Sequence, residues 1–227
     1  MKLTLKDRRP VIENVESFVF EADQPVKWQA GQYMHYVFPH KDEDDRGEER
    51  WFTISAAPFE GRLMLTTRFD AKKSSSFKKA LRDLPNGAAI QADGPEGKFT
   101  ITDLSKKYIL IAGGIGITPF RSILAQLDHD GKDIKADLLY ANRDQNLVFG
   151  DELRALEAKH LDFHIKTYID DQRIGREELE EYSKDPNTVF YISGPKPMVE
   201  TYQKTLADIG VPEDRVKTDY FPGYQLG

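Results

Sequence analysis

The sequence of 227 residues contains no cysteine. Disulfide bonds, thiol catalysis and an iron–sulfur cluster ligated by cysteines of this chain are therefore excluded. The chain also lacks any apolar run close to the roughly 20 residues that span a bilayer. Its first residues, MKLTLKDRRPVIENVE, lack the apolar core of a signal peptide. We therefore expect no membrane span and a cytoplasmic location.

The chain also has no excess of basic residues. The chain has 32 Lys and Arg against 38 Asp and Glu, which gives a formal net charge of −6. Proteins that bind nucleic acid usually present a basic face, so the composition argues against that class. A content of 39% hydrophobic and 31% charged residues is ordinary for a protein with packed cores. The length suits two domains of roughly 100 residues each.

The pattern of the sequence changes near residue 104. Before it, short segments with strand-like spacing are separated by turn residues, which is typical of an antiparallel barrel or sandwich. These segments are 15–22, 31–38, 50–57, 62–69 and 88–94, with one helix expected over 75–84. After it, strands and helices alternate, which predicts a parallel sheet covered on both faces. The expected strands are 108–114, 136–142, 163–170, 188–194 and 215–221, and the expected helices are 119–129, 148–159, 176–183 and 196–209. We therefore predict two domains, 1–104 and 105–227.

Residues 108–122, YILIAGGIGITPFRS, read as an apolar strand, a glycine turn and a helix that opens at Pro119. Gly113, Gly114 and Gly116 can adopt positive φ and allow the backbone to approach a ligand closely. Free amides and the dipole of a new helix would hold a pyrophosphate there. The spacing departs from the dinucleotide fingerprint G-x-G-x-x-G, and tight connections also favour glycine. A binding turn and a plain connection both remain open.

The full string GGIGITP, which includes Thr118, resembles the nicotinamide-nucleotide segment of the ferredoxin–NADP reductase superfamily. Three further motifs of that family are present, and the resemblance covers almost the whole chain. It implies an antiparallel β-barrel flavin domain over 1–104, followed by an α/β parallel-sheet domain that binds NAD(P)H over 105–227.

The second motif is Arg50-Trp51-Phe52-Thr53, and the resemblance gives these residues the task of holding FAD. An arginine offers a bidentate fork to a phosphate of the pyrophosphate. Phe52 would place an apolar ring against the isoalloxazine or the ribityl chain, where the family often has tyrosine. Thr53 would present its hydroxyl and N–H to flavin N5, which makes it the candidate catalytic residue. The alternative is an exposed strand end with a charged cap.

The third motif combines Ser74, Ser75 and Ser76 with the turn GPEGKF at 94–99. By resemblance the serines belong to the loop that contacts the pyrophosphate, although Lys72 or Lys73 replaces its usual glycine. Serines at this point also suit the N-cap of any helix. The turn matches the one that closes the flavin barrel, and we interpret it as mainly structural.

The fourth motif, Ser193 to Met198, matches a segment that approaches the nicotinamide and its ribose through Gly194, Pro195 and Met198. Ser193 stands near the usual cysteine of plant-type ferredoxin reductases and cytochrome b5 reductases, which places the resemblance nearer the bacterial, cysteine-free branch. Met198 is equally consistent with a core residue of a helix.

Asn142 and Arg143 follow the strand ADLLY, where this fold contacts the adenosine ribose. Arg143 would pair with a 2′-phosphate and favour NADPH, unless it is simply exposed. At the other end of the domain, Phe221 or Tyr224 would cover the flavin face, unless the segment is only a last strand and a tail.

The resemblance implies a flavoprotein oxidoreductase that passes hydride from NAD(P)H to bound FAD and on to an electron carrier such as ferredoxin or flavodoxin. No metal is expected. Two alternatives remain: a reductase of quinone, free flavin or ferric chelates, and a non-autonomous electron-transfer or regulatory subunit. A local basic cluster would steer an acidic carrier, unless these are merely solvated side chains of a helix. Its members are Lys72, Lys73, Lys78, Lys79 and Arg82. The acidic segment 40–49 is interpreted as a solvated hairpin tip.

Overall fold

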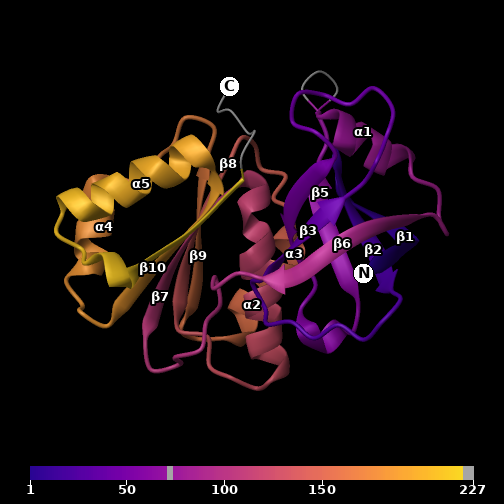
Figure 1. The fold of residues 1–227 in the computed structure, drawn as a ribbon. Helices are drawn as coiled ribbons and strands as arrows, with labels where there is room; N and C mark the ends of the chain where they lie inside the picture. The colour runs from indigo at the N-terminus through magenta and orange to yellow at the C-terminus, as the bar shows by residue number, and fades with distance from the viewer. Residues whose placement is uncertain (71–73, 222–227) are drawn as a thin grey trace. The chain divides into compact units, whose positions relative to one another are not determined.

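The protein is described by a computed structural model that covers residues 1–70 and 74–221 (Figure 1). The chain divides into two compact units, Met1–Thr100 and Ile101–Gly227. The division follows the change of sequence pattern. Among the described residues, none of the helices is long and apolar enough to cross a membrane.

Unit 1 is built on a six-stranded antiparallel sheet with the order β4-β3-β6-β1-β2-β5. Its strands are β1 (Lys2–Ile12), β2 (Val15–Ala22), β3 (Tyr33–Val37), β4 (Glu49–Thr53), β5 (Leu63–Arg68) and β6 (Ala89–Glu96). The segment after β4 reaches the opposite edge of the sheet, because the N–H of Ser55 donates to the carbonyl of Met64 at 2.8 Å. The sheet therefore curls into a barrel, and helix α1 (Ser76–Asp83) adds Phe77 and Leu81 to its core.

Strand β1 has no counterpart among the predicted strands. Leu3 and Leu5 alternate as buried residues of one face, but the second half of the strand is rich in charge and contains Pro10. A register shift between Leu5 and Asp7 also interrupts the period of two. The period-two signal therefore covers only the start of β1.

Unit 2 is a five-stranded parallel sheet with the order β11-β10-β7-β8-β9. Its strands are β7 (Lys107–Gly113), β8 (Ala136–Asn142), β9 (Phe163–Ile169), β10 (Thr188–Pro195) and β11 (Val216–Phe221). Its helices are α2 (Thr118–His129), α3 (Gly150–Lys159), α4 (Arg176–Ser183) and α5 (Lys196–Asp208). Apolar side chains of α4 and α5 form one core with the sheet, and Figure 1 shows α2 and α3 on the opposite face. The predicted fold class, an antiparallel barrel followed by a parallel α/β sheet, is confirmed.

The strand order defines where this sheet binds ligands. The chain starts at β7 in the middle, builds β8 and β9 on one side, and then returns to build β10 and β11 on the other. Ligands of such sheets bind at the carboxyl ends of the strands where this order reverses. In unit 2 that point lies between β7 and β10.

Candidate functional site

The turn after β7 lies at this switch point. The strand ends at Gly113, a 3-10 turn (η2) covers Gly114–Ile117, and α2 begins at Thr118 with Pro119 in its first turn. Gly114 has a φ of +52°, and the nearest atom to a Cβ built on it would be Asn142 Oδ1 at 3.9 Å. The backbone at Gly114 is therefore free of steric cover by its neighbours, as close approach of a ligand requires.

The two glycine motifs of unit 2 meet in this place. A Cβ on Gly116 would lie 2.2 Å from the carbonyl oxygen of Ser193, and one on Gly194 would lie 3.2 Å from the Cα of Gly113. A Cβ on Gly113 would lie 2.5 Å from the sulfur of Met198 and 3.0 Å from Pro195. These glycines are thus required by the packing of one turn on the other. Met198 is 9% exposed and belongs to the core of unit 2, so its packing role is clear from the structure.

Asn142 and Arg143 stand at the end of β8 as predicted from the strand pattern. The Asn142 side chain donates to the carbonyls of Asp144 at 2.9 Å and Asn146 at 3.2 Å, which fixes a tight turn. Arg143 and Asp144 are both exposed on that turn. A cation and a carboxylate are therefore neighbours at the position expected to contact the ribose.

The end of β11 adds a residue that the motifs did not indicate. Asp219 pairs in register with Ser193 of β10. Burial raises the pKa of Asp219 to about 6, and the hydroxyl of Ser193 lowers it by a smaller amount. In the sequence, only the position of this aspartate near the end of the last expected strand could have indicated it. The backbone of Phe221 pairs with Pro195, whereas Tyr224 lies outside the described residues.

In unit 1, Arg50 is held by the chain around it. Its Nη1 donates to the carbonyls of Arg46 at 2.7 Å and Gly47 at 2.9 Å, and its Nη2 donates to Asp44 Oδ1 at 3.1 Å. The guanidinium also lies 5.5 Å from the ring centre of Phe77 on α1. Arg50 is therefore placed beside the start of α1, with one arm of its fork on a carboxylate.

The three predicted serines at the start of α1 all have partners within the chain. Ser75 is the N-cap, because its Oγ accepts from the N–H of Lys78 at 3.3 Å. Ser74 Oγ accepts from the N–H of Asp70 at 2.7 Å. The N–H of Ser76 donates to Asp44 Oδ2 at 2.8 Å. Of the three serines, only Ser76 donates to the carboxylate of Asp44.

The interpretation of segment 40–49 as a solvated hairpin tip was wrong at Asp44. Most of the segment is exposed, but Asp44 turns inward to the start of α1. Burial acts to raise the pKa of Asp44, yet the N–H groups of Ser76 and Arg46 and the charges of Arg46 and Arg50 lower it to about 2. The side chain is thus a carboxylate across the neutral range. Donors that stabilise this carboxylate also fit a phosphate oxygen, which has the same charge and the same need for N–H groups.

The aromatic residues of β4 differ in exposure. Phe52 is 9% exposed and lies in the core against Tyr36 and Phe77, whereas Trp51 is 50% exposed. The Trp51 indole stacks on His35 with ring centres 4.4 Å apart. The accessible flat ring of this motif is therefore Trp51. Thr53 is 3% exposed at the end of the strand.

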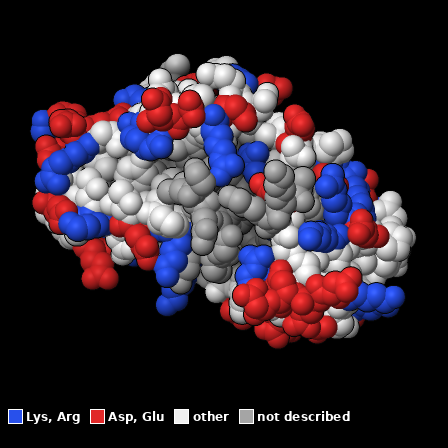
Figure 2. Space-filling view, turned by 90° about the horizontal axis from the view of Figure 1, so that it is seen from above, with Lys and Arg blue, Asp and Glu red and all other residues white. Residues whose placement is uncertain are grey.

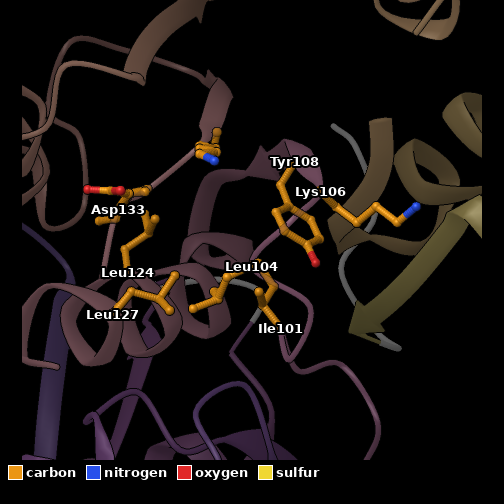
Figure 3. A pocket seen from close by; sticks show the side chains of 10 residues that line it. Ile101, Leu104, Lys106, Tyr108, Leu124, Leu127 and Asp133 are labelled. Atoms are coloured by element: carbon orange, nitrogen blue, oxygen red, sulfur yellow. The ribbon is translucent and has the colours of Figure 1, made fainter. Parts of the chain in front are cut away.

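Two cavities within the described part of unit 2 lie away from the site. One lies at the opposite edge of the parallel sheet, where β7 and β8 begin, between Tyr108, Leu124 and Ala136 (Figure 3). Its volume of about 10 Å³ is enough for a single water. A second, of about 210 Å³, lies between α3 and the strands β8 and β9. Neither is lined by a residue of the glycine motifs.

The basic cluster near α1 is partly used within unit 1. Lys78 donates to the carbonyl of Arg68 at 2.9 Å, and Arg82 lies 3.6 Å from Glu16. Lys79 is exposed, and Lys72 and Lys73 lie outside the described residues. On the face seen in Figure 2, the described Lys and Arg side chains are interspersed with Asp and Glu.

Comparison with known proteins agrees with this arrangement. Residues 110–204 match the oxidoreductase NAD-binding domain family. The chain is 35% identical over 115 residues to the carnitine monooxygenase reductase subunit of Acinetobacter pittii, a match that covers 50% of this chain and 36% of that protein. It is 25% identical over 238 residues to a flavohemoprotein of Xylella fastidiosa, covering 97% of this chain and 58% of that protein. The chain thus spans well under two thirds of either relative.

Solved structures share the whole fold. The FAD- and NAD-binding domain of the nitric oxide dioxygenase of Vibrio cholerae superposes with a TM-score of 0.80 at 20% identity, covering 97% of this chain and 98% of that chain. The antiparallel barrel, the parallel sheet and their sequential order therefore recur together in a flavin- and nucleotide-binding protein. The chain therefore carries an oxidoreductase NAD-binding domain, and it shares the two-unit fold of an FAD- and NAD-binding domain.

Proposed function

We propose that the chain is a reductase module, with FAD bound by residues 1–104 and NAD(P)H by residues 105–227. FAD, when bound, supplies the redox chemistry, because it accepts a hydride from NAD(P)H and releases the electrons to an acceptor. The observation that carries the proposal is the junction of the two glycine turns at the switch point between β7 and β10.

The residues of unit 2 have distinct roles in this proposal. The backbone at Gly113, Gly114 and Gly116 and the start of α2 at Thr118 and Pro119 hold the pyrophosphate of the nucleotide. Gly194, Pro195 and Met198, which pack directly on this turn, bind the nicotinamide end. Asn142 contacts the ribose of the adenosine. Phe221 and Tyr224 are assigned to covering the flavin.

Unit 1 holds FAD at two places. Arg50 and the amide of Ser76 bind the pyrophosphate, with Ser74 and Ser75 shaping the loop that leads into α1. The strand of Trp51, Phe52 and Thr53 supports the flavin ring, with the Thr53 hydroxyl directed at N5. Trp51 supplies the exposed aromatic surface, and Phe52 supports the strand from within the core.

We assign the acceptor to the class of separate electron-carrier proteins, such as ferredoxin or flavodoxin. The name of one relative, a carnitine monooxygenase reductase subunit, supports an acceptor on a separate subunit. The chain has no cysteine, so a cluster that receives its electrons belongs to another chain or domain. Arg143 favours NADPH by pairing with the 2′-phosphate, whereas Asp144 next to it favours the free ribose hydroxyl of NADH.

A panel of acceptors tests the proposal. We expect NAD(P)H-dependent reduction of ferricyanide, and a higher kcat/KM with a [2Fe–2S] ferredoxin or a flavodoxin than with a quinone, free flavin or a ferric chelate. The reverse order would support a reductase of small acceptors. A protein that retains FAD but reduces none of them, ferricyanide included, would contradict autonomous turnover and support an electron-transfer or regulatory subunit.

A further inference from the structure

The start of α1 and the acidic segment 40–49 are joined by a reciprocal pair of hydrogen bonds. The N–H of Ser76 donates to Asp44 Oδ2 at 2.8 Å, and the N–H of Asp44 donates to Ser76 Oγ at 3.0 Å. His40 Nε2 lies 2.8 Å from the same Ser76 Oγ, while its Nδ1 lies 2.6 Å from the carbonyl of Phe38. Because a carbonyl can only accept, Nδ1 carries a proton, and Nε2 shares a hydrogen bond with the Ser76 hydroxyl. The segment is therefore docked on the helix through Ser76.

The carboxylate of Asp44 also accepts a hydrogen bond from Arg50. Asp44 Oδ1 accepts from Arg50 Nη2 at 3.1 Å and from the N–H of Arg46 at 3.1 Å. The Nη2 of Arg46 lies 3.4 Å from Asp44 Oδ2. Both carboxylate oxygens are thus engaged by donors from three residues.

The remaining arm of Arg50 bonds to the backbone of segment 40–49. Its Nη1 is shared among backbone carbonyls of the segment, including that of Glu49 at 2.5 Å, and its buried Nε has no hydrogen-bond partner among residues 1–70 and 74–221. Arg50 therefore presents only one N–H arm toward the start of α1, and Asp44 takes it. A bidentate contact with a phosphate requires the fork to turn out of this arrangement.

These contacts place a fixed negative charge where the proposed function puts the pyrophosphate of FAD. Two anions that share the same donors repel each other, and the donors cannot serve both at full strength. Either the flavin phosphate binds elsewhere, or the carboxylate leaves when the flavin arrives. The donor set favours the second, because Arg50 and a helix N-terminus are the groups that bind phosphate best.

We propose that Asp44 is a built-in competitor of the flavin pyrophosphate: its carboxylate closes the anion site between Arg50 and α1, and segment 40–49 must undock before FAD is held there. This inference rests on the proposed function, since it concerns the affinity of the same site for FAD. Asp44 pairs with both Arg50 and the start of α1. The segment then sets how tightly and how fast the cofactor is taken up.

Replacement of the carboxylate tests the competition. Apoprotein of the full chain is titrated with FAD for the wild type, Asp44→Asn and Asp44→Ala, with flavin fluorescence or calorimetry as the readout. Both variants should bind FAD at least tenfold more tightly. Asp45→Asn is the matched control, because it removes the same charge from an exposed neighbour in the segment and should change the affinity less than twofold.

Two probes separate the phosphate effect from other causes. Riboflavin has no phosphate, so its affinity should be the same in all variants. Inorganic pyrophosphate should bind Asp44→Asn at least tenfold more tightly than the wild type, and Arg50→Ala introduced into Asp44→Asn should abolish that gain.

The outcomes distinguish this inference from the function on which it rests. Equal or weaker binding of FAD to Asp44→Asn and Asp44→Ala would overturn the competition while leaving the proposed function intact. An equal gain with Asp45→Asn would also overturn it, because the effect would then be one of overall charge. Tighter pyrophosphate binding to Asp44→Asn without any flavin binding would show that Asp44 closes an anion site, and it would overturn both FAD as the cofactor and the competition with it.

Discussion

At the scale of single residues, the function of a side chain depends on its hydrogen-bond partners and its burial as well as on its residue type. Arginine commonly binds phosphate, yet the guanidinium of Arg50 donates to Asp44, which lies six positions earlier in the sequence. Thr53 has the type of a hydrogen-bond donor to the flavin, and it is almost fully buried. Both assignments are therefore tested by changes that alter one group and leave its surroundings in place.

Thr53→Val preserves the shape of the side chain and removes the hydroxyl. We expect FAD to remain bound and the reduction of the flavin by NAD(P)H to slow by tenfold or more, because a charge-assisted or positioning hydrogen bond is worth about 1.5–3 kcal/mol. Stopped-flow bleaching of the flavin measures this rate. Thr67→Val is the matched control, since Thr67 is another buried threonine of the barrel and its replacement should leave the rate unchanged. An unchanged rate in Thr53→Val would limit Thr53 to packing.

Arg143→Ala tests the choice of coenzyme. If Arg143 binds the 2′-phosphate, the loss for NADPH is about 1.5–3 kcal/mol in kcat/KM, whereas the value for NADH hardly changes. Steady-state kinetics with both coenzymes provide the comparison. Arg176→Ala, which removes an exposed arginine paired with Glu180 on α4, should affect neither. Equal losses for both coenzymes would show that Arg143 does not select between them, and Asp144 would then be the residue to examine.

At the scale of secondary-structure elements, the ends of β7 and β10 are held together by residues without side chains. Gly116 touches the backbone of Ser193, and Gly113 and Gly194 make room for each other and for Met198. Two turns that are about 80 residues apart in the chain thus form one surface at the switch point. Substitutions here act first on packing and only then on the ligand.

Gly116→Ala should destabilise unit 2, because its Cβ would lie 2.2 Å from the carbonyl oxygen of Ser193. Overpacking of this kind costs about 1–3 kcal/mol, and more where backbone must shift. Chemical denaturation gives the loss, and nucleotide binding should fall with it. Gly175→Ala is the control, since its Cβ would meet only Glu177 Oε2 at 3.4 Å, an ordinary contact. A fully stable Gly116→Ala that has lost only nucleotide binding would assign Gly116 to the pyrophosphate alone.

The pairing of β10 with β11 predicts a pH dependence of stability. Burial raises the pKa of Asp219 from 3.8 to about 6, so the folded state prefers the protonated acid. The stability that Asp219 contributes is complete below pH 4 and is lost as the pH rises through 6, by about 3 kcal/mol at most.

The Asp219→Asn variant should not lose stability in this way, because an asparagine side chain does not ionise. The variant should gain stability relative to the wild type between pH 4 and pH 7, as followed by denaturant unfolding at both values. Asp214→Asn, in the exposed turn before β11, should show no such gain. A constant difference between Asp219→Asn and the wild type over this range would contradict a raised pKa of Asp219.

The elements that the sequence predicts well are those with a local signal. The consecutive residues from Tyr108 to Pro119 predict a strand, a turn and the start of a helix, and the structure has these elements in this order. Strand β1 and Asp44 were not predictable in this way. Half of β1 is charged and its register shifts, while the role of Asp44 depends on Ser76, which lies 32 residues away in the sequence. Contacts between distant segments are fixed by the fold, and no periodicity of one segment reveals them.

At the scale of the whole molecule, each unit has its own core and its own turn to which we assign anion binding. Unit 1 has the start of α1 with Arg50, and unit 2 has the start of α2 with its glycines. The proposed division of labour, FAD in one unit and NAD(P)H in the other, follows from these two turns. The cofactor and its reduction are therefore the claim on which the remaining assignments depend.

The visible spectrum of the purified protein, recorded without oxygen before and after NADPH or NADH is added, tests this claim most directly. We expect flavin bands near those of free FAD, heat release of FAD rather than FMN, and bleaching of the bands by at least one of the two coenzymes. A colourless protein that no flavin reconstitutes, or a bound flavin that neither coenzyme reduces, would contradict the account.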